Sequence, residues 1–322
     1  MMTKKLLLPV LLGLSLMLQT ATVQSATISV SQFVEHPALD AVLKGFQDYL
    51  KEKNIDVTYN VHNAQANMST ATQIAQQMVG EKADLLVAIA TPSAQTCAQA
   101  LSKAPTHLKR PFLFTAVTDP VSAGLVKDLQ KPTGGITGVS DLLPVKEHIK
   151  MVLEYYPAIK TLGLLYNAGE ANSKATILSI KELAPELGIK VVEATASKTA
   201  DVYQATKSLV GRVDAVFIPT DNTIISALES VIKVGVQNKL PIFAADVDSV
   251  KRGAVAAMGF DYYKHGYQTG ALAEKILGGM APEDIPVEFQ KDLQLYINAN
   301  FSKQMGLTPP EALLKKATQV YE

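Results

Sequence analysis

The chain lacks tryptophan and has a single cysteine, Cys97. One thiol cannot form a disulfide within the chain or a cysteine-rich metal cluster, so we expect no metal site of that kind. Aromatic residues make up only 6% of the sequence, which argues against surfaces that stack on bases or sugars. Lysine and arginine (30) balance aspartate and glutamate (30), so the chain also lacks the positive charge of a protein that coats nucleic acid.

The remaining composition is that of a folded protein with an ordinary core. Hydrophobic residues make up 48% of the chain and charged residues 19%. A length of 322 residues, at roughly 150 residues per domain, predicts two domains.

The first residues follow the order of a secretory signal peptide. Lys4 and Lys5 precede an apolar run at residues 6–18, and small or polar residues follow at 19–26. The run is too short to span a hydrocarbon core of ~30 Å, although an uncleaved anchor is the alternative. We predict a signal peptide at 1–25, cleaved after Ser25. No cysteine lies near that site, so we expect a periplasmic protein and not a lipoprotein.

The rest of the chain alternates short β-branched runs with helix-length amphipathic stretches, which predicts parallel βαβ units covered on both faces. The first series of expected strands is 27–31, 56–61, 84–88, 112–114 and 135–138, with helices at 38–53, 69–80, 93–103 and 121–129. The second series is 161–166, 190–193, 214–218, 242–244 and 254–258, with helices at 145–155, 173–187, 201–210 and 222–238.

The two series also resemble each other in sequence. The segment 84–91 resembles 214–220, and each ends at a threonine followed by a polar helix start. We therefore predict an α/β fold with two doubly wound parallel-sheet lobes joined by three crossovers. The expected first lobe is 26–140 plus about 262–290, and the expected second lobe is 141–261 plus about 291–322. Crossovers near 139–142 and 259–261 and in the C-terminal tail would form a hinge.

Motifs for catalysis are missing from the sequence. It has no phosphate-binding loop, no G-x-S-x-G elbow, no H-E-x-x-H pair and no dinucleotide fingerprint. The five histidines stand far apart, without the spacing of metal ligands. Cys97 falls within the apolar pattern of a helix and is expected to pack as a small hydrophobic residue. We therefore expect neither an enzyme nor a cofactor, with an exported enzyme kept as a minor alternative.

Ligands of open α/β sheets bind beyond the carboxyl ends of the strands, so polar residues at strand ends are the candidates for a site. Thr91, which we expect to cap a helix, and Ser93 follow one strand; Thr118 follows the next, and Asn172 opens a helix of the second lobe. Free N–H groups and hydroxyls at such helix starts attract a carboxylate. Plain helix capping is the alternative for each of them.

Acidic residues dominate the strand ends of the second lobe. Asp221 and Asp246 follow two strands, and Asp141 lies at an expected crossover. A carboxylate desolvated in a closed cleft needs a cation, which the ammonium of a ligand would supply. Donors on one wall and carboxylates on the other suit a zwitterion. Gln32, together with Glu35 and His36, follows the first strand and is expected to reach the side chain of the ligand.

Several strings in order along the chain resemble one known family. They are V-E-H-P-A-L-D at 34–40, A-T-P-S-A-Q at 90–95, V-T-D-P-V at 117–121, G-V-S-D at 138–141 and P-T-D-N at 219–222. With the export signal and the duplicated lobes, these resemble the ABC transporter substrate-binding proteins of the tryptophan/tyrosine-uptake type. The resemblance covers essentially the whole mature chain.

This resemblance implies a periplasmic-binding-protein fold of type I and delivery of a small solute to a membrane permease and its ATPase. It also implies that Ser93 and Thr118 hold a ligand carboxylate and that Asp246 holds the amine. The absence of tryptophan departs from an aromatic-binding site, so stacking on a ligand ring would depend on Phe33, Tyr166 or Phe260.

The sequence thus predicts a monomeric solute-binding protein for a small zwitterion, expected to be an aromatic or branched amino acid. A ligand-sensing module that docks on a receptor kinase is one alternative. A binder of a nucleoside or sugar is another, although the three arginines outside the expected signal peptide supply few hydrogen-bond donors for it.

Overall fold

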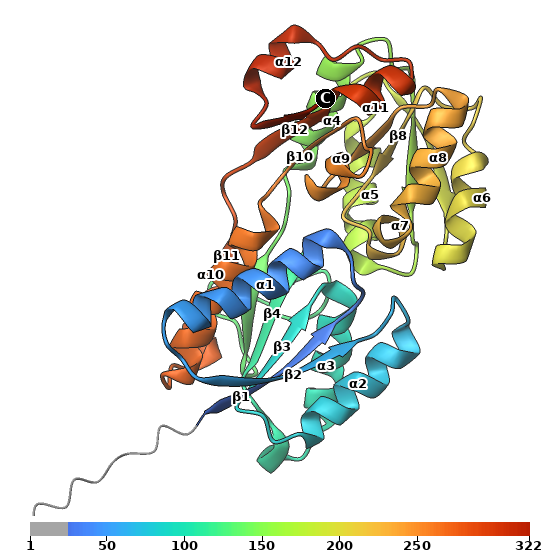
Figure 1. Cartoon of the computed structure of the whole chain (residues 1–322). Helices are drawn as coiled ribbons and strands as arrows, with labels where there is room; N and C mark the ends of the chain where they lie inside the picture. Colours follow the sequence, from blue (N-terminus) through green and yellow to red (C-terminus); the bar gives the residue numbers. More distant parts are fainter. Residues whose placement is uncertain (1–24) are drawn as a thin grey trace, which may run out of the picture.

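The computed structural model describes residues 25–322, and the predicted signal peptide lies outside the described residues except for Ser25. Two α/β lobes lie one above the other, with connecting segments running between them (Figure 1). Within the described residues, no helix is both long and apolar enough to cross a membrane.

The first lobe is built on a parallel sheet with the strand order β11-β5-β4-β3-β1-β2. Its strands are β1 (Ala26–Gln32), β2 (Val57–Asn63), β3 (Leu85–Ile89), β4 (Phe112–Val117), β5 (Ile136–Ser140) and β11 (Glu288–Phe289). All residues of β3 and β4 are buried, because helices cover both faces of a parallel sheet.

Helices α1 (Pro37–Glu52) and α10 (Tyr262–Leu277) pack side by side on one face of this sheet, and α2 (Met68–Gly80) and α3 (Thr91–Lys103) pack on the other (Figure 1). A short 3-10 turn, η1 (Thr106–Leu108), precedes β4, and another, η3 (Pro282–Asp284), precedes β11. Backbones of α1 and α10 touch: a Cβ added at Gly266 would lie 1.9 Å from the carbonyl oxygen of Val42. Only glycine permits so close an approach.

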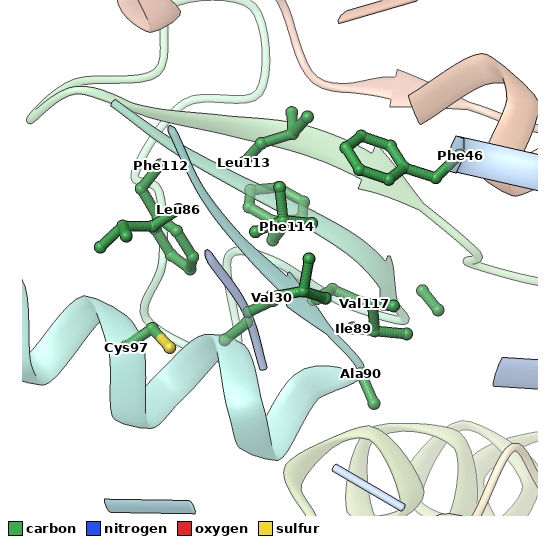
Figure 2. Close-up of a cluster of buried hydrophobic side chains, with 14 of the residues drawn as sticks. Val30, Phe46, Leu86, Ile89, Ala90, Cys97, Phe112, Leu113, Phe114 and Val117 are labelled. Atoms are coloured by element: carbon green, nitrogen blue, oxygen red, sulfur yellow. The ribbon is translucent and has the colours of Figure 1, made fainter. Parts of the chain in front are cut away.

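The core of the first lobe lies between the sheet and these two helix layers. Phe46 of α1 packs on one side of β4, while Cys97 of α3 packs on the other side, close to Leu86 and Phe112 (Figure 2). Cys97 is 1% exposed, and burial raises the pKa of its thiol to about 12. The prediction that Cys97 packs as a small hydrophobic residue is confirmed.

The second lobe contains a mixed sheet with the order β13-β12-β10-β9-β8-β6-β7. Its strands are β6 (Thr161–Tyr166), β7 (Lys190–Thr195), β8 (Ala215–Ile218), β9 (Ile242–Ala244), β10 (Ala256–Gly259), β12 (Gln294–Asn298) and β13 (Gln319–Tyr321). Every neighbouring pair is parallel except β10 and β12, which are antiparallel.

Helices again cover both faces of the second sheet. They are α4 (Val145–Tyr155), α5 (Ala171–Leu183), η2 (Thr199–Asp201), α6 (Val202–Lys207), α7 (Asn222–Ser226), α8 (Leu228–Asn238), α9 (Asp248–Lys251), α11 (Ala299–Gln304) and α12 (Glu311–Lys316). Contacts pair α4 with α5 and α6 with α8.

The chain passes between the lobes three times. It leaves the first lobe between β5 and α4, returns between β10 and α10, and leaves again between β11 and β12. The predicted fold class, two doubly wound lobes with three crossovers, is confirmed.

Two predicted helices differ from the structure. Residues 121–129 form turns, because Asp119 Oδ1 accepts from the N–H groups of Val121 and Ser122 and Gly124 has a φ of +76°. The helix predicted at 222–238 is divided into α7 and α8 at Ala227, whose φ of −114° and ψ of 25° interrupt the helical path.

Candidate ligand-binding site between the lobes

A small cavity lies between the two lobes, at the carboxyl ends of their strands. Side chains and backbone of both lobes line it: His36, Ala38, Leu39, Ala116, Thr118, Asp141, Asn172, Thr220, Asn222, Ile225, Asp246 and Tyr262. The place where two facing sheets end is where open α/β folds bind ligands.

The N-terminus of α1 forms part of the first lobe's wall. Residue His36 is the N-cap, with extended backbone and no capping hydrogen bond from its side chain, and Pro37 opens the helix. The next residues, Ala38 and Leu39, line the cavity. Because the first N–H groups of a helix have no partner within it, this end of the 16-residue helix offers donors and a positive dipole to the cavity.

The end of β4 also reaches the cavity, through an irregular backbone. The register with β5 shifts between Thr115 and Val117, and the intervening Ala116 has a φ of +52°. The Ala116 N–H donates to His265 Nε2 of α10 at 3.0 Å, which holds the bulge in place. A bulge of this kind re-aims neighbouring side chains, here that of Thr118.

Asp141 lies at the first crossover and is buried. Its Oδ2 accepts from the Tyr262 hydroxyl at 2.9 Å, while its Oδ1 has no hydrogen-bond partner. Burial raises the pKa of the Asp141 carboxyl, because the charged form is desolvated. A buried acceptor facing a cavity without a protein partner is a site for a ligand donor.

Asp246 follows β9 and supplies a second buried carboxylate to the cavity. It accepts from the Ser249 N–H at 2.8 Å and from the Ser249 hydroxyl at 2.6 Å. Burial raises the pKa of Asp246 as well. Among residues 25–322, no Lys, Arg or His side chain forms an ion pair with Asp141 or Asp246.

A third buried carboxylate, Glu170, orders the amides of the second lobe's wall. It accepts from Asn222 Nδ2 at 2.7 Å, from Asn172 Nδ2 at 3.1 Å, and from the Thr223 N–H and hydroxyl at 2.9 and 2.7 Å. Asn172 Nδ2 also donates to the Thr220 carbonyl at 2.6 Å, and its Oδ1 has no partner. Glu170 therefore fixes both asparagines that line the cavity.

Two contacts close the lobes over the cavity. The hydroxyl oxygens of Thr118 and Thr220 lie 3.2 Å apart, and His36 Nε2 lies 3.5 Å from Asn222 Oδ1. Each contact joins one lobe to the other, so the structure has the closed arrangement.

Four predicted site residues, Thr118, Asp141, Asn172 and Asp246, line the cavity. The other four, Thr91, Ser93, Gln32 and Asp221, do not. Ser93 is buried, and its Oγ accepts from the buried Ser31 hydroxyl at 3.0 Å. The Gln32 amide donates to the Val34 carbonyl at 3.0 Å and to Asp40 Oδ1 at 2.7 Å.

Asp221 serves the fold of the second lobe. It caps α7 by accepting from the Ile224 N–H at 2.8 Å, and it accepts from the Asn167 N–H and the Ser173 hydroxyl at 2.6 Å each. Burial and the neighbouring Glu170 charge raise its pKa. The predicted cap at Thr91 also differs, because α3 begins at Thr91 itself, after Ala90 with a φ of 81°.

None of the rings suggested for stacking, Phe33, Tyr166 and Phe260, lines the cavity. Sequence reasoning missed Tyr262, Glu170 and Asn222. Asn222 follows the Asp221 strand end and could have been found by the same rule, and Tyr262 follows the second crossover. Glu170 follows the end of β6 and stands two residues before Asn172, so the same rule could have found it as well.

Comparison with known proteins places this geometry in a class. The fold is that of the type I periplasmic binding proteins, whose two lobes enclose a ligand. A family model described as "ABC transporter substrate binding protein" matches residues 27–321. The chain therefore belongs to the ABC transporter substrate-binding protein family.

Individual relatives agree with this. The chain is 40% identical over 293 residues to a tyrosine-binding protein of Clostridioides difficile, covering 90% of this chain and 83% of the relative. A solved Streptococcus domain in complex with L-Trp is 35% identical, with a TM-score of 0.87, over 92% of this chain and 99% of that one.

A third relative shows the other arrangement of the lobes. The ligand-free, open structure of a substrate-binding protein from Clostridium difficile is 38% identical over 92% of this chain and 99% of that one, yet its TM-score is 0.67. Since its sequence is no more distant than that of the L-Trp complex, the lower score agrees with a different placement of the lobes. The closed cavity described above therefore has an open counterpart within the family.

Proposed function

We propose that this protein is the periplasmic binding component of an ABC importer, which encloses one aromatic amino acid between its lobes and presents it to a membrane permease. The observation that carries the ligand class is the pair of buried carboxylates at the cavity, Asp141 and Asp246, neither of which forms an ion pair with a Lys, Arg or His side chain among residues 25–322. An unpaired buried carboxylate is costly, and a ligand ammonium would neutralise it.

The wall of the first lobe suits the carboxylate of such a ligand. The N-terminus of α1 lies at the cavity, where Ala38 and Leu39 belong to the lining and the first N–H groups of the helix have no partner within it. A carboxylate is stabilised there by the donors and by the helix dipole. A ligand whose ammonium lies at Asp141 and Asp246 and whose carboxylate lies at the N-terminus of α1 has the two charged groups of an α-amino acid.

Closure of the two lobes connects ligand binding to recognition by the permease. The ligand contacts both lobes only when they are closed, so its differential affinity shifts the population toward the closed state. A permease that recognises a surface formed by both lobes would then bind the loaded protein selectively. The relatives named for tyrosine and L-Trp support an aromatic ligand.

The test is calorimetric titration of the chain from residue 26 onward with L-tyrosine, L-tryptophan and L-phenylalanine. N-acetyl-L-tyrosine, which lacks the ammonium, and tyramine, which lacks the carboxylate, are the matched ligand controls. We expect an aromatic amino acid to bind and both controls to lose at least about 2 kcal/mol of binding free energy. The first control leaves the buried carboxylates without a cation, and the second leaves the N–H groups of α1 without their acceptor.

Two substitutions, one in the proposed site and one on the surface, test whether the loss of binding is specific to the site. Asp246→Asn should weaken tyrosine binding strongly, and Asp56→Asn, at an exposed position of the first lobe, should not change it. Binding of a sugar or nucleoside with no response to any amino acid would overturn the zwitterion assignment.

A further inference from the structure

Asn172, at the start of α5, lines the cavity and is 3% exposed. Its amide nitrogen donates to the Thr220 carbonyl at 2.6 Å and to Glu170 Oε2 at 3.1 Å, so both hydrogens of the amide have acceptors. Its Oδ1 has no hydrogen-bond partner among the described residues. Buried polar atoms are seldom left unpaired, so an unpaired acceptor in a cavity wall indicates a missing donor.

Glu170 decides which way this amide points. If the amide were turned over, Asn172 Oδ1 would lie against the Glu170 carboxylate and the Thr220 carbonyl, and these acceptors would repel one another. The Glu170 carboxylate is itself held in place. Its Oε1 accepts from the N–H and the hydroxyl of Thr223, and its Oε2 accepts from Asn222 Nδ2. The oxygen of Asn172 is therefore directed away from Glu170.

Two carboxylates line the same cavity and offer acceptors of their own. Among the described residues Asp141 Oδ1 has no partner, and the Asp246 oxygens, each of which accepts from Ser249, keep lone pairs for a further donor. Burial, together with the charges of Asp141 and Asp246, raises the pKa of Tyr262 well above its usual value. Both carboxylates therefore lie near the Tyr262 hydroxyl.

Short contacts connect Asn172 with this pair of carboxylates. Asn172 donates to the Thr220 carbonyl, and the hydroxyl oxygens of Thr220 and Thr118 lie 3.2 Å apart. The Asp141 N–H donates to the carbonyl of Val117, the residue before Thr118, at 3.3 Å. Because the cavity is small and Asn172, Thr118 and Asp141 all line it, one group of a ligand that carries several donors can meet its acceptors together.

We propose that Asn172 Oδ1 is the third acceptor for the ligand ammonium, beside Asp141 and Asp246, and that Glu170 is the positioning residue that directs it. The inference rests on the proposed function, which brings an ammonium to the two carboxylates. A primary ammonium has three N–H donors, and the cavity offers three acceptors to match them. Only the ammonium group of the ligand takes part in these contacts.

Three acceptors favour a primary ammonium over a secondary one. N-methyl-L-tyrosine keeps the positive charge and the carboxylate of tyrosine but has only two N–H donors. Hydrogen bonds from a cation to a carboxylate are stronger than those to a neutral amide, so the methyl group takes the place opposite Asn172. It then leaves Asn172 Oδ1 unpaired, and the complex loses one hydrogen bond to a charged group.

Dissociation constants of L-tyrosine and N-methyl-L-tyrosine are measured by calorimetry on the wild type, Asn172→Ala, Glu170→Gln and the double variant, with thermal unfolding as the check on folding. We expect the wild type to bind tyrosine at least about tenfold more tightly than the methylated ligand. Asn172→Ala should weaken tyrosine binding about tenfold. It should leave N-methyl-L-tyrosine binding unchanged or tighter, because the shortened side chain makes room for the methyl group.

The ratio of the two dissociation constants separates a positioning role of Glu170 from a purely structural one. Glu170→Gln lets the Asn172 amide turn, so it should lower the preference for tyrosine in the wild-type background and not in the Asn172→Ala background. Loss of lobe closure through Asn222 would weaken both ligands alike. An unchanged ratio in Glu170→Gln, or an equal fall of the ratio in both backgrounds, would therefore overturn the positioning role.

The acceptor role of Asn172 has its own test within the same measurements. A wild type that binds both ligands equally, an unchanged affinity for tyrosine in Asn172→Ala, or equal losses of both ligands there would overturn it, and tyrosine binding by the wild type would still keep the proposed function. No binding of any amino acid to the folded wild type would overturn both.

Discussion

The hydroxyl oxygens of Thr118 and Thr220 lie 3.2 Å apart, although the residues belong to different lobes and are separated by 102 positions in the chain. This contact joins the two lobes beside the cavity, which both threonines line. The same two side chains therefore take part in closure and in the wall of the site.

Replacing one of these threonines should weaken ligand binding through closure. Thr220→Val keeps the shape of the side chain but removes the hydroxyl, so the closed state loses one hydrogen bond, worth about 0.5–1.5 kcal/mol. We expect a several-fold higher dissociation constant by calorimetry and, by small-angle scattering, a ligand-free population shifted toward the open form. An unchanged affinity would show that the contact does not stabilise closure.

Asp141→Asn should have opposite effects on the free and the loaded protein. It removes a buried carboxylate without a cation, while the amide oxygen can still accept from Tyr262, so we expect the ligand-free protein to gain about 1 kcal/mol of unfolding free energy. Ligand binding should lose about 2–5 kcal/mol with the ammonium partner. Thermal unfolding with and without tyrosine measures both. A variant that is less stable without ligand and binds tyrosine normally would contradict this account.

Acidification should destabilise the protein through its buried histidines. The pKa values of His36, His148 and His265 are lowered from 6.5 to about 4 by burial. Between pH 6.5 and 4 the unfolded chain binds protons that the folded chain excludes, so stability falls as pH falls, by about 1.4 kcal/mol per pH unit for each histidine.

His148→Phe isolates one of these contributions. Denaturant unfolding across this pH range should show a slope smaller by about 1.4 kcal/mol per pH unit than in the wild type. Substitution of His107, which is exposed, is the control and should leave the slope unchanged. An unchanged slope in His148→Phe would mean that His148 titrates alike in both states.

The backbone contact between α1 and α10 should tolerate no side chain. A Cβ at Gly266 would lie 1.9 Å from the Val42 carbonyl oxygen, so Gly266→Ala must push the two helices apart at a cost of about 1–3 kcal/mol. Gly80→Ala, at the end of α2 with no atom within 4 Å of the added Cβ, is the matched control and should be neutral within about 0.5 kcal/mol. Chemical denaturation of the two variants gives the comparison.

The sequence predicted most of the fold because buried parallel strands have a strong signal. The run 85–89 is wholly apolar and wholly buried, and its counterpart at 215–218 behaves in the same way. The predicted helix at 121–129 failed because one carboxylate, Asp119, and a left-handed glycine favour turns there. Such local hydrogen bonds override a helical periodicity.

The candidate site was only half visible from the sequence. Asp221 and Asp246 both follow strands of the second lobe, yet only Asp246 reaches the cavity, because Asn167, Ser173 and Ile224 surround the Asp221 carboxylate. Those contacts depend on how α5 packs beside α7, which no local pattern encodes. At α1 the donors belong to the backbone, so the identities of Ala38 and Leu39 give no sign of them.

The place of α10 in the chain has a consequence for synthesis. This helix covers one face of the first sheet, and β11 completes its edge, but both follow the second lobe's strands β6–β10 in sequence. A chain growing from its N-terminus thus produces β1–β5 long before the helix that buries their apolar face. Part of the core of the first lobe stays uncovered until α10 and β11, which end at Leu277 and Phe289, have been made. The sheet of the second lobe likewise includes β13, which follows β11 in sequence, so each lobe needs segments made after most of the other lobe.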